Sequence, residues 1–458
     1  MSNRILIRNA RVVTMDPVLG DLDRGDVLVD GEHIVDVLPS PSPGREPSDE
    51  AVTGPQVRVI DGTDFLVAPG FVDTHRHTWQ SAMRHTYADL DPMQYFAEVL
   101  GRIGPSYEAD DVRVGNLLGA VGALSAGTTT LVDWSHIQNT PEHSDAAVEG
   151  LRAAGIRGVF AHGWPLVVDD SWRTESKLGH PQDLRRVKDR YFSSDDQLLT
   201  LAMAARGPEE AAPDVAFDDL RLARELGIRT TVHVGAYARN AHHHAVAQYH
   251  AAGLLGDDMT FVHCNRLHDE ELQMIADAGA TVSLGAHCEM NSAGIGDIPL
   301  DRLLRIGVRP ALSGDTETKC TGDMFTQMKM IFASYRSWTG GGHSSVAEPV
   351  PLTMRDVLEF ATVQGARAVG MESRVGSITP GKQADLIMIR ATDPNLGPVL
   401  NPVAAIVLAA HEGNVDSVMV AGRFVKRDGR MTDVDPRAVV DEAQRSQDRI
   451  SSRARARA

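Results

Sequence analysis

The stretch "PGFVDTHRH", residues 69–77, decides between the α/β folds that the sequence allows. It ends an apolar strand candidate with two histidines two residues apart, His75 and His77. Alternate residues of a strand point to the same side, so both imidazoles can face one ligand. Open doubly wound sheets usually carry a glycine-rich phosphate-binding turn after this first strand. A strand that ends in histidines instead favours a closed barrel, whose chemistry lies at the strand ends.

Seven similar strand candidates follow, and helical stretches such as "AFDDLRLAREL" (216–226) separate them. They are "GTTTLVDW", "GIRGVFAHG", "LLTLAMAAR", "GIRTTVHV", "MTFVHC", "ATVSLGAH" and "VRPALSGD". Repeated βα units indicate a parallel sheet, and eight of them fit a (β/α)8 TIM-like barrel. The sequence therefore predicts an α/β protein with this barrel over residues 67–372.

Short strands with alternating polarity occupy both ends of the chain, at residues 1–66 and 373–432. We expect them to combine into one small β-sandwich domain, because their character matches and the barrel lies between them. Residues 433–458 have the composition of a C-terminal helix that frays into a basic, disordered tail.

The composition and net charge of the chain limit the kinds of molecule that we expect it to bind. The chain has 458 residues, of which 42% are hydrophobic, and a formal net charge of −17. Nucleic acids and anionic membranes select basic surfaces, so we expect neither as a partner and favour a small neutral organic substrate. No apolar run approaches the length of a membrane span or a signal peptide, and only three cysteines occur, without a C-x-x-C pair. A cytoplasmic location is therefore the expectation.

Histidines recur where the later strand candidates end. His233, His263 and His287 follow the fifth, sixth and seventh strands, and Asp315 ends the eighth in "SGDTET". One such histidine is more often structural, but five with an aspartate are hard to explain by core packing. We predict that His75, His77, His233 and Asp315 bind one divalent ion. Imidazole and carboxylate ligands suit Zn²⁺ first, with Co²⁺, Fe²⁺ or Mn²⁺ as alternatives.

These residues carry a resemblance over nearly the whole chain. "PGFVDTHRH", the later histidines, "SGD" and "GSITPGKQADLIMI" resemble the amidohydrolase superfamily, in its branch of cytosine and guanine deaminases and triazine hydrolases. The resemblance implies the barrel with its small β-sandwich, the four ligands above, a homo-oligomer, and His263 as a catalytic residue beside a metal-bound water. Binuclear relatives place a lysine on the fourth strand, which here ends "AMAARGPEE" without one, so we expect one metal.

The sequence departs from that branch at one position. Its deaminases continue from the fifth-strand histidine as H-x-x-E, and the glutamate protonates a ring nitrogen. In "HVGAYARN" the corresponding residue is Ala236. Alanine cannot move a proton, a role worth about 10²–10⁴-fold in rate.

A carbonyl substrate does not need this acid, because the metal or His263 can polarise its oxygen while Asp315 takes the proton of the attacking water. The leading prediction is therefore a metal-bound hydroxide that cleaves a C–N or C–S bond at the carbonyl of a urea, carbamate, thiocarbamate or amide. Phenylurea hydrolases, which act on herbicides, and molinate hydrolase are the relatives suggested. The alternative is a deaminase or dechlorinase of a cytosine, guanine or triazine type heterocycle, with Glu289 or Glu317 as the acid. A metal-poor binding barrel is the non-enzyme alternative.

Three residues are the candidate substrate contacts. Trp79 belongs to a helical stripe that favours core packing, but its closeness to the histidines suggests an apolar wall. His287 can orient a ligand, touch the substrate or bond to the backbone. Glu289 lies next to a strand end, although a solvent-facing loop acid is the more ordinary interpretation.

Overall fold

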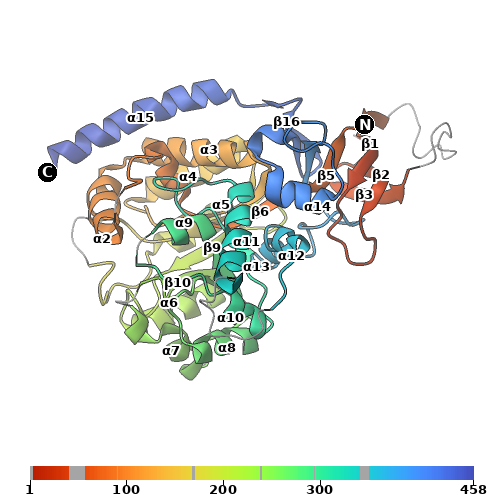
Figure 1. The fold of residues 1–458 in the computed structure, drawn as a ribbon. Helices are drawn as coiled ribbons and strands as arrows, with labels where there is room; N and C mark the ends of the chain where they lie inside the picture. The colour runs from red at the N-terminus through yellow and green to blue at the C-terminus, as the bar shows by residue number, and fades with distance from the viewer. Residues whose placement is uncertain are drawn as a thin grey trace.

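The computed structural model describes residues 4–40, 57–89, 91–167, 171–237, 240–292, 294–340 and 350–457. Two sheets organise them: eight parallel strands in sequence order form a barrel, and strands from both chain ends form a separate sheet beside it (Figure 1). The predicted (β/α)8 fold is confirmed. No helix in the described ranges is both long and apolar enough to cross a membrane.

All eight predicted barrel strands are present. They are β6 (Phe71–Arg76), β7 (Thr128–Ser135), β8 (Arg157–His162), β9 (Leu199–Ala205), β10 (Arg229–Val234), β11 (Met259–His263), β12 (Thr281–Leu284) and β13 (Ala311–Leu312). Every residue of β7 and β8 is buried, as is usual for parallel strands that are covered on both faces.

Helices cover the outside of the barrel. They include α3 (Ala109–Ser125), α4 (Pro141–Ala154), α5 (Asp183–Tyr191), α6 (Pro213–Glu225), α7 (Ala245–Ala251), α8 (Asp269–Asp277), α9 (Ala286–Asn291), α10 (Leu300–Arg305), α11 (Met324–Gly340), α12 (Met354–Phe360) and α13 (Val363–Ala368). Short helices lie between β6 and α3: η1 (Thr78–Met83), α2 (Pro92–Tyr95), η2 (Phe96–Ile103) and η3 (Gly104–Ser106).

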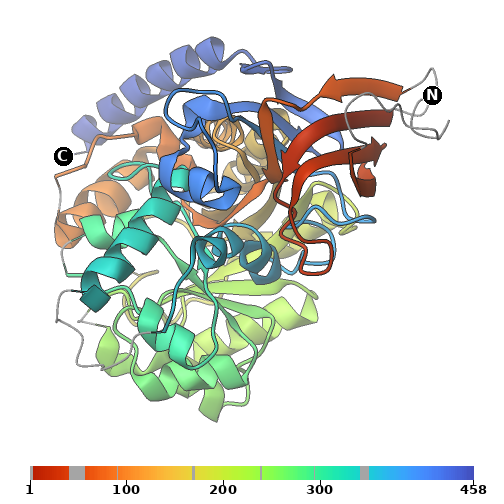
Figure 2. The same cartoon turned by 45° about the vertical axis from the view of Figure 1, so that its right-hand side comes forward.

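The second sheet combines the two ends of the chain, as Figure 2 shows from another side. Its strands are β1 (Arg4–Val12), β2 (Leu22–Asp30), β3 (His33–Pro39), β4 (Val57–Asp61), β5 (Phe65–Pro69), β14 (Leu386–Arg390), β15 (Val415–Val420), β16 (Arg423–Arg427) and β17 (Arg430–Met431). Strand β5 pairs with both β1 and β14, which joins the N-terminal and C-terminal strands. The boundary that we expected between residues 66 and 67 falls inside β5.

The C-terminal helix differs from the expectation. Helix α15 (Pro436–Ala456) continues nearly to the chain end and lies along α3 (Figure 1). The predicted fraying of the basic end is wrong because Arg449 and Arg453 both pair with the buried Asp111 of α3.

Candidate metal centre and active site

The hydrogen bonds that close the barrel also position three of the predicted ligands. Asp315 follows β13, and its backbone N–H donates to the carbonyl of His75 at 2.9 Å. The N–H of His77 donates in turn to the carbonyl of Asp315 at 2.8 Å. The first and last strands of the barrel therefore meet at the residues that are to bind the ion.

The four predicted ligands converge at the strand ends. The Nε2 atoms of His75 and His233 lie 3.1 Å apart. The Oδ1 atom of Asp315 lies 3.6 Å from Nε2 of His75 and 3.6 Å from Nε2 of His77. These side chains come from β6 and the residue that follows it, from β10 and from the loop after β13, so the fold gathers residues that are far apart in sequence.

The donor set fits a divalent metal. One ligand atom from each of His75, His77 and Asp315 lies within 4.8 Å of the others, and the same holds for His75, His233 and His263. Burial lowers the pKa of His77 to about 3 and lowers that of His233, which leaves neutral imidazoles with free lone pairs. Nδ1 of His77 is within hydrogen-bonding distance of the Trp134 carbonyl, at 3.1 Å, which favours the tautomer with Nε2 available for a metal.

Asp315 supplies the negative charge of the cluster. Although burial works against it, the neighbouring imidazoles of His75, His263 and His77 hold the pKa of Asp315 well below its usual range. An ionised carboxylate among neutral imidazoles is a suitable first coordination sphere for Zn²⁺.

His263 faces the cluster and is oriented from behind. Its Nε2 lies 4.0 Å from Oδ2 of Asp315, and its ring stacks on that of His233 with centroids 5.4 Å apart. Its Nδ1 lies 3.1 Å from Oε1 of Glu289. Burial alone would lower the pKa of His263, but the carboxylates of Glu289 and Asp315 raise it above its usual value. The ring is thus placed to hold a proton beside the cluster.

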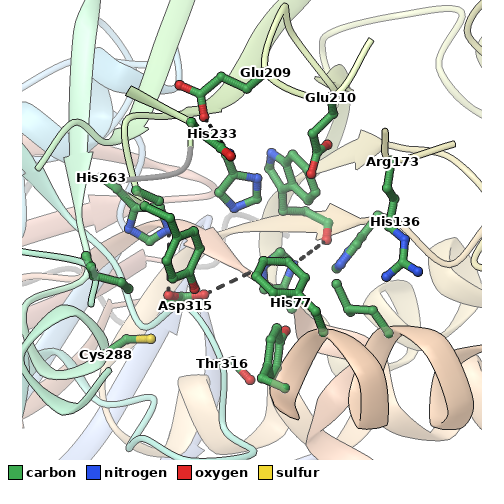
Figure 3. Close-up of a pocket in the computed structure, with 18 of the residues that line it drawn as sticks. His77, His136, Arg173, Glu209, Glu210, His233, His263, Cys288, Asp315 and Thr316 are labelled. Carbon is green, nitrogen blue, oxygen red and sulfur yellow. Dashed lines mark hydrogen bonds and ion pairs between the residues drawn. The ribbon is translucent and has the colours of Figure 1, made fainter. Parts of the chain in front are cut away.

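A cavity opens directly onto the cluster (Figure 3). Its apolar wall is largely aromatic and includes Tyr95, Phe96, Trp134, Trp164 and Tyr237. Its polar lining includes His136, Arg173, Glu209, Glu210 and Lys319. The arrangement suits a planar group held against the ligand side chains.

The three predicted substrate contacts do not line this cavity. The Trp79 side chain is fully buried and packs edge-on against Tyr107, with centroids 5.0 Å apart, so it belongs to the core. Nδ1 of His287 lies 3.2 Å from Oγ1 of Thr321. Glu289 is buried behind His263, where it also accepts from the N–H of Gly285. The apolar wall that we expected Trp79 to form is instead built by the aromatic residues named above.

Neither carboxylate that we considered as the missing acid is available for that role. Glu289 is engaged by His263. Glu317 accepts hydrogen bonds from Ser81 and Arg84 and lies 3.7 Å from the Arg76 guanidinium. Although burial works against it, these two arginines lower the pKa of Glu317. Glu317 is therefore an ionised member of a buried ion cluster.

Sequence reasoning missed Glu209 and His136 as cavity residues. The available signal was their position: Glu209 follows the end of β9, and His136 follows the end of β7. The loops that follow the barrel strands are the segments that form the active-site face.

The barrel and the cluster together define a metal-dependent hydrolase that acts on carbon–nitrogen bonds. The chain belongs to the amidohydrolase family, which residues 66–425 match.

Several relatives of known name cover almost the entire chain. A 5'-deoxyadenosine deaminase of Methanothermobacter thermautotrophicus is 28% identical over 433 residues, 93% of this chain and 94% of the relative. A 5-methylthioadenosine/S-adenosylhomocysteine deaminase of Symbiobacterium thermophilum is 28% identical over 435 residues, with 93% and 94% covered.

Solved structures show the same fold. An adenosine deaminase from Xanthomonas campestris with bound zinc superposes with a TM-score of 0.83 at 23% identity, covering 98% of both chains. Atrazine chlorohydrolase from Arthrobacter aurescens, also with zinc, gives 0.83 at 20% identity and covers 97% of this chain and 100% of its own. The two deaminases that are 28% identical to this chain favour the deaminase alternative, and they give no support to the expected hydrolysis of phenylureas or thiocarbamates.

Proposed function

We propose that this protein is an aminohydrolase that replaces the exocyclic amino group of a planar nitrogen heterocycle with oxygen. The aromatic cavity that opens onto the histidine and aspartate cluster carries this proposal. Trp134 and Trp164, whose ring centroids lie 5.2 Å apart, line it beside the ligand His233. These two indole rings meet edge to face, and a flat substrate ring can pack against the aromatic wall that they form while its amino-bearing carbon faces the cluster.

In this proposal His75, His77, His233 and Asp315 hold one divalent ion, with Zn²⁺ as the first choice. The ion would act as a Lewis acid that lowers the pKa of a bound water. The Asp315 carboxylate accepts a proton from the attacking water, and His263, held by Glu289, donates a hydrogen bond to the oxygen that attacks.

Adenine nucleosides are the first substrate class to assay. The relatives named above are deaminases of 5'-deoxyadenosine, methylthioadenosine and S-adenosylhomocysteine. A neutral nucleoside also agrees with a chain whose formal net charge is −17. The predicted homo-oligomer and the cytoplasmic location remain part of the proposal.

The test is a substrate panel for the metal-replete protein. Adenine nucleosides, guanine, cytosine and aminotriazines form one arm, and phenylureas, carbamates and thiocarbamates form the other. We expect ammonia release in the first arm, with one metal ion per chain by elemental analysis. Turnover confined to the second arm would overturn the proposal.

Hydrolysis at a carbonyl is the second candidate, because Ala236 leaves no carboxyl at the position where deaminases of this kind carry one. The second arm of the panel tests it directly. An aryl amine or thiol released together with carbon dioxide would identify it.

A further inference from the structure

The cavity carries a carboxyl group next to the position where the deaminase glutamate is missing. Ala236 lines the cavity and is only 5% exposed, so a methyl group stands where those deaminases carry a carboxyl. The preceding N–H, that of Gly235, donates to Oε1 of Glu209 at 2.7 Å. A carboxyl from another strand thus lies against the backbone beside Ala236.

The register of the barrel explains this neighbourhood. Strand β9 pairs with β10 in parallel, and Ala205 lies opposite Val232. Glu209 is four residues beyond Ala205, and Ala236 is four residues beyond Val232. The two positions therefore correspond across adjacent strands at the active-site face.

Glu209 is held in a defined orientation. Its second oxygen accepts a hydrogen bond from Nδ2 of Asn240 at 3.0 Å. Figure 3 shows its carboxyl on the His233 side of the cavity, whereas Glu210 lies on the side of Arg173. Both glutamates line the cavity, and Glu209 is bonded to the segment that follows the metal-ligand histidine.

The surroundings also favour the protonated form of Glu209. Burial raises its pKa to about 7, against the opposing effects of the Gly235 N–H, the Asn240 amide and the charge of His263. A carboxylic acid with this pKa can both give and accept a proton near neutral pH.

We propose that Glu209 is the catalytic proton donor of this enzyme and replaces, from the end of β9, the glutamate that Ala236 lacks. This inference rests on the proposed aminohydrolase function. Glu209 gives its proton to a ring nitrogen while the oxygen of water bonds to the adjacent amino-bearing carbon and Asp315 takes one proton of that water. Asp315 then gives this proton to the amino group, the C–N bond breaks and ammonia leaves. The new hydroxyl becomes a carbonyl by returning its proton to Glu209.

The experiment moves the acid between the two strands. Glu209→Gln should lower kcat by about 10²–10⁴-fold, the usual worth of a general acid, with KM within a few-fold and metal content unchanged. The double variant that also carries Ala236→Glu should have a kcat at least tenfold higher than that of Glu209→Gln alone. The matched control is Glu271→Gln, because Glu271 is a buried glutamate that accepts a backbone N–H, from Ala247, but does not line the cavity.

The possible outcomes separate the two proposals. A wild-type protein that deaminates no heterocycle in the panel overturns the function, and the acid role falls with it. An active wild type together with a Glu209→Gln variant that keeps full kcat overturns the acid role alone. A variant that loses activity together with its metal or its folded state, and that Ala236→Glu does not rescue, also contradicts the inference.

Discussion

Two of the residues nearest the proposed chemistry have a backbone conformation that L-residues rarely adopt. The φ angle is 55° at Asp315 and 76° at His263, both in the left-handed region. Such a conformation costs on the order of 1–3 kcal/mol and persists where the surrounding structure enforces it. At Asp315 the two backbone hydrogen bonds with His75 and His77 provide that enforcement. The closure of the barrel therefore fixes the carboxylate among the histidines.

Asp315→Asn tests this role. The amide keeps the shape but loses the charge that balances the ion, so we expect metal affinity and kcat to fall by roughly 100-fold or more while the circular dichroism spectrum is unchanged. His75→Ala should behave in the same way. Elemental analysis and turnover assays provide the measurement, and Asp258→Asn, at a surface pair with Arg224, is the control. Full activity in Asp315→Asn would contradict the assigned ligand set.

The raised pKa of Glu209 has a consequence for stability that does not depend on turnover. Its pKa is about 7 in the folded protein and 4.5 as the ordinary value, so the folded state binds the proton more tightly. This contribution to stability is complete below pH 4.5 and is lost as the pH rises through 7. Between pH 5 and pH 8 we expect metal-free wild type to lose about 1–3 kcal/mol more unfolding free energy than Glu209→Gln. Urea titrations at both pH values measure this, and an equal loss in both proteins would be the contrary result.

At the scale of elements, one glycine divides what the sequence presents as a single strand. The run "FLVAPGFVDTH" contains β5 of the second sheet and β6 of the barrel, with Gly70 between them. A Cβ atom at Gly70 would lie 2.2 Å from Oγ1 and Cγ2 of Thr129, the residue beside it on β7. The chain thus passes from one sheet to the other where the backbone is pressed against a neighbouring strand.

Gly70→Ala should therefore destabilise the protein by about 1–3 kcal/mol, the usual cost of overpacking a core. Adding Thr129→Ala removes the two nearest atoms and should restore part of this loss. Gly179→Ala is the control, because the nearest atom to its added Cβ, Oδ1 of Asp219, lies 4.0 Å away. Urea unfolding compares the four proteins, and an undiminished midpoint in Gly70→Ala would show that the contact relaxes freely.

The elements also show which parts of the fold and of the candidate site could be predicted from the sequence. Buried parallel strands leave apolar runs, so all eight barrel strands and the histidines at their ends could be predicted, whereas the division at Gly70 could not, because one apolar run covers both strands. The helical spacing of apolar residues predicts that Trp79 is buried, but it does not predict which residues Trp79 contacts. Glu209 resembles a solvated loop acid until the pairing of β9 with β10 places it beside Ala236. In these cases the deciding information is the contacts between elements, which the pattern within one element does not contain.

At the scale of the whole molecule, helix α15 ties the C-terminus to the barrel. Its buried residues are Val439, Ala443, Ser446, Ile450 and Ala454, a spacing of three or four that forms one stripe. The Ser446 hydroxyl donates to the Asp111 carboxylate of α3 at 2.7 Å. A polar helix is thus held by a narrow apolar stripe and by one buried acid.

Ile450→Ala tests whether this stripe stabilises the fold. The side chain is completely buried, so its truncation should lower the unfolding free energy by about 2–5 kcal/mol, whereas Val440→Ala, on the exposed side of the same helix with 51% exposure, should change it by less than about 0.5 kcal/mol. The kcat of both variants should equal that of wild type, because no residue of α15 lines the cavity. Equal unfolding midpoints for the two variants would mean that α15 only rests on the barrel surface. A lower midpoint for Ile450→Ala alone, with kcat retained, would show that the helix stabilises the barrel without taking part in its chemistry.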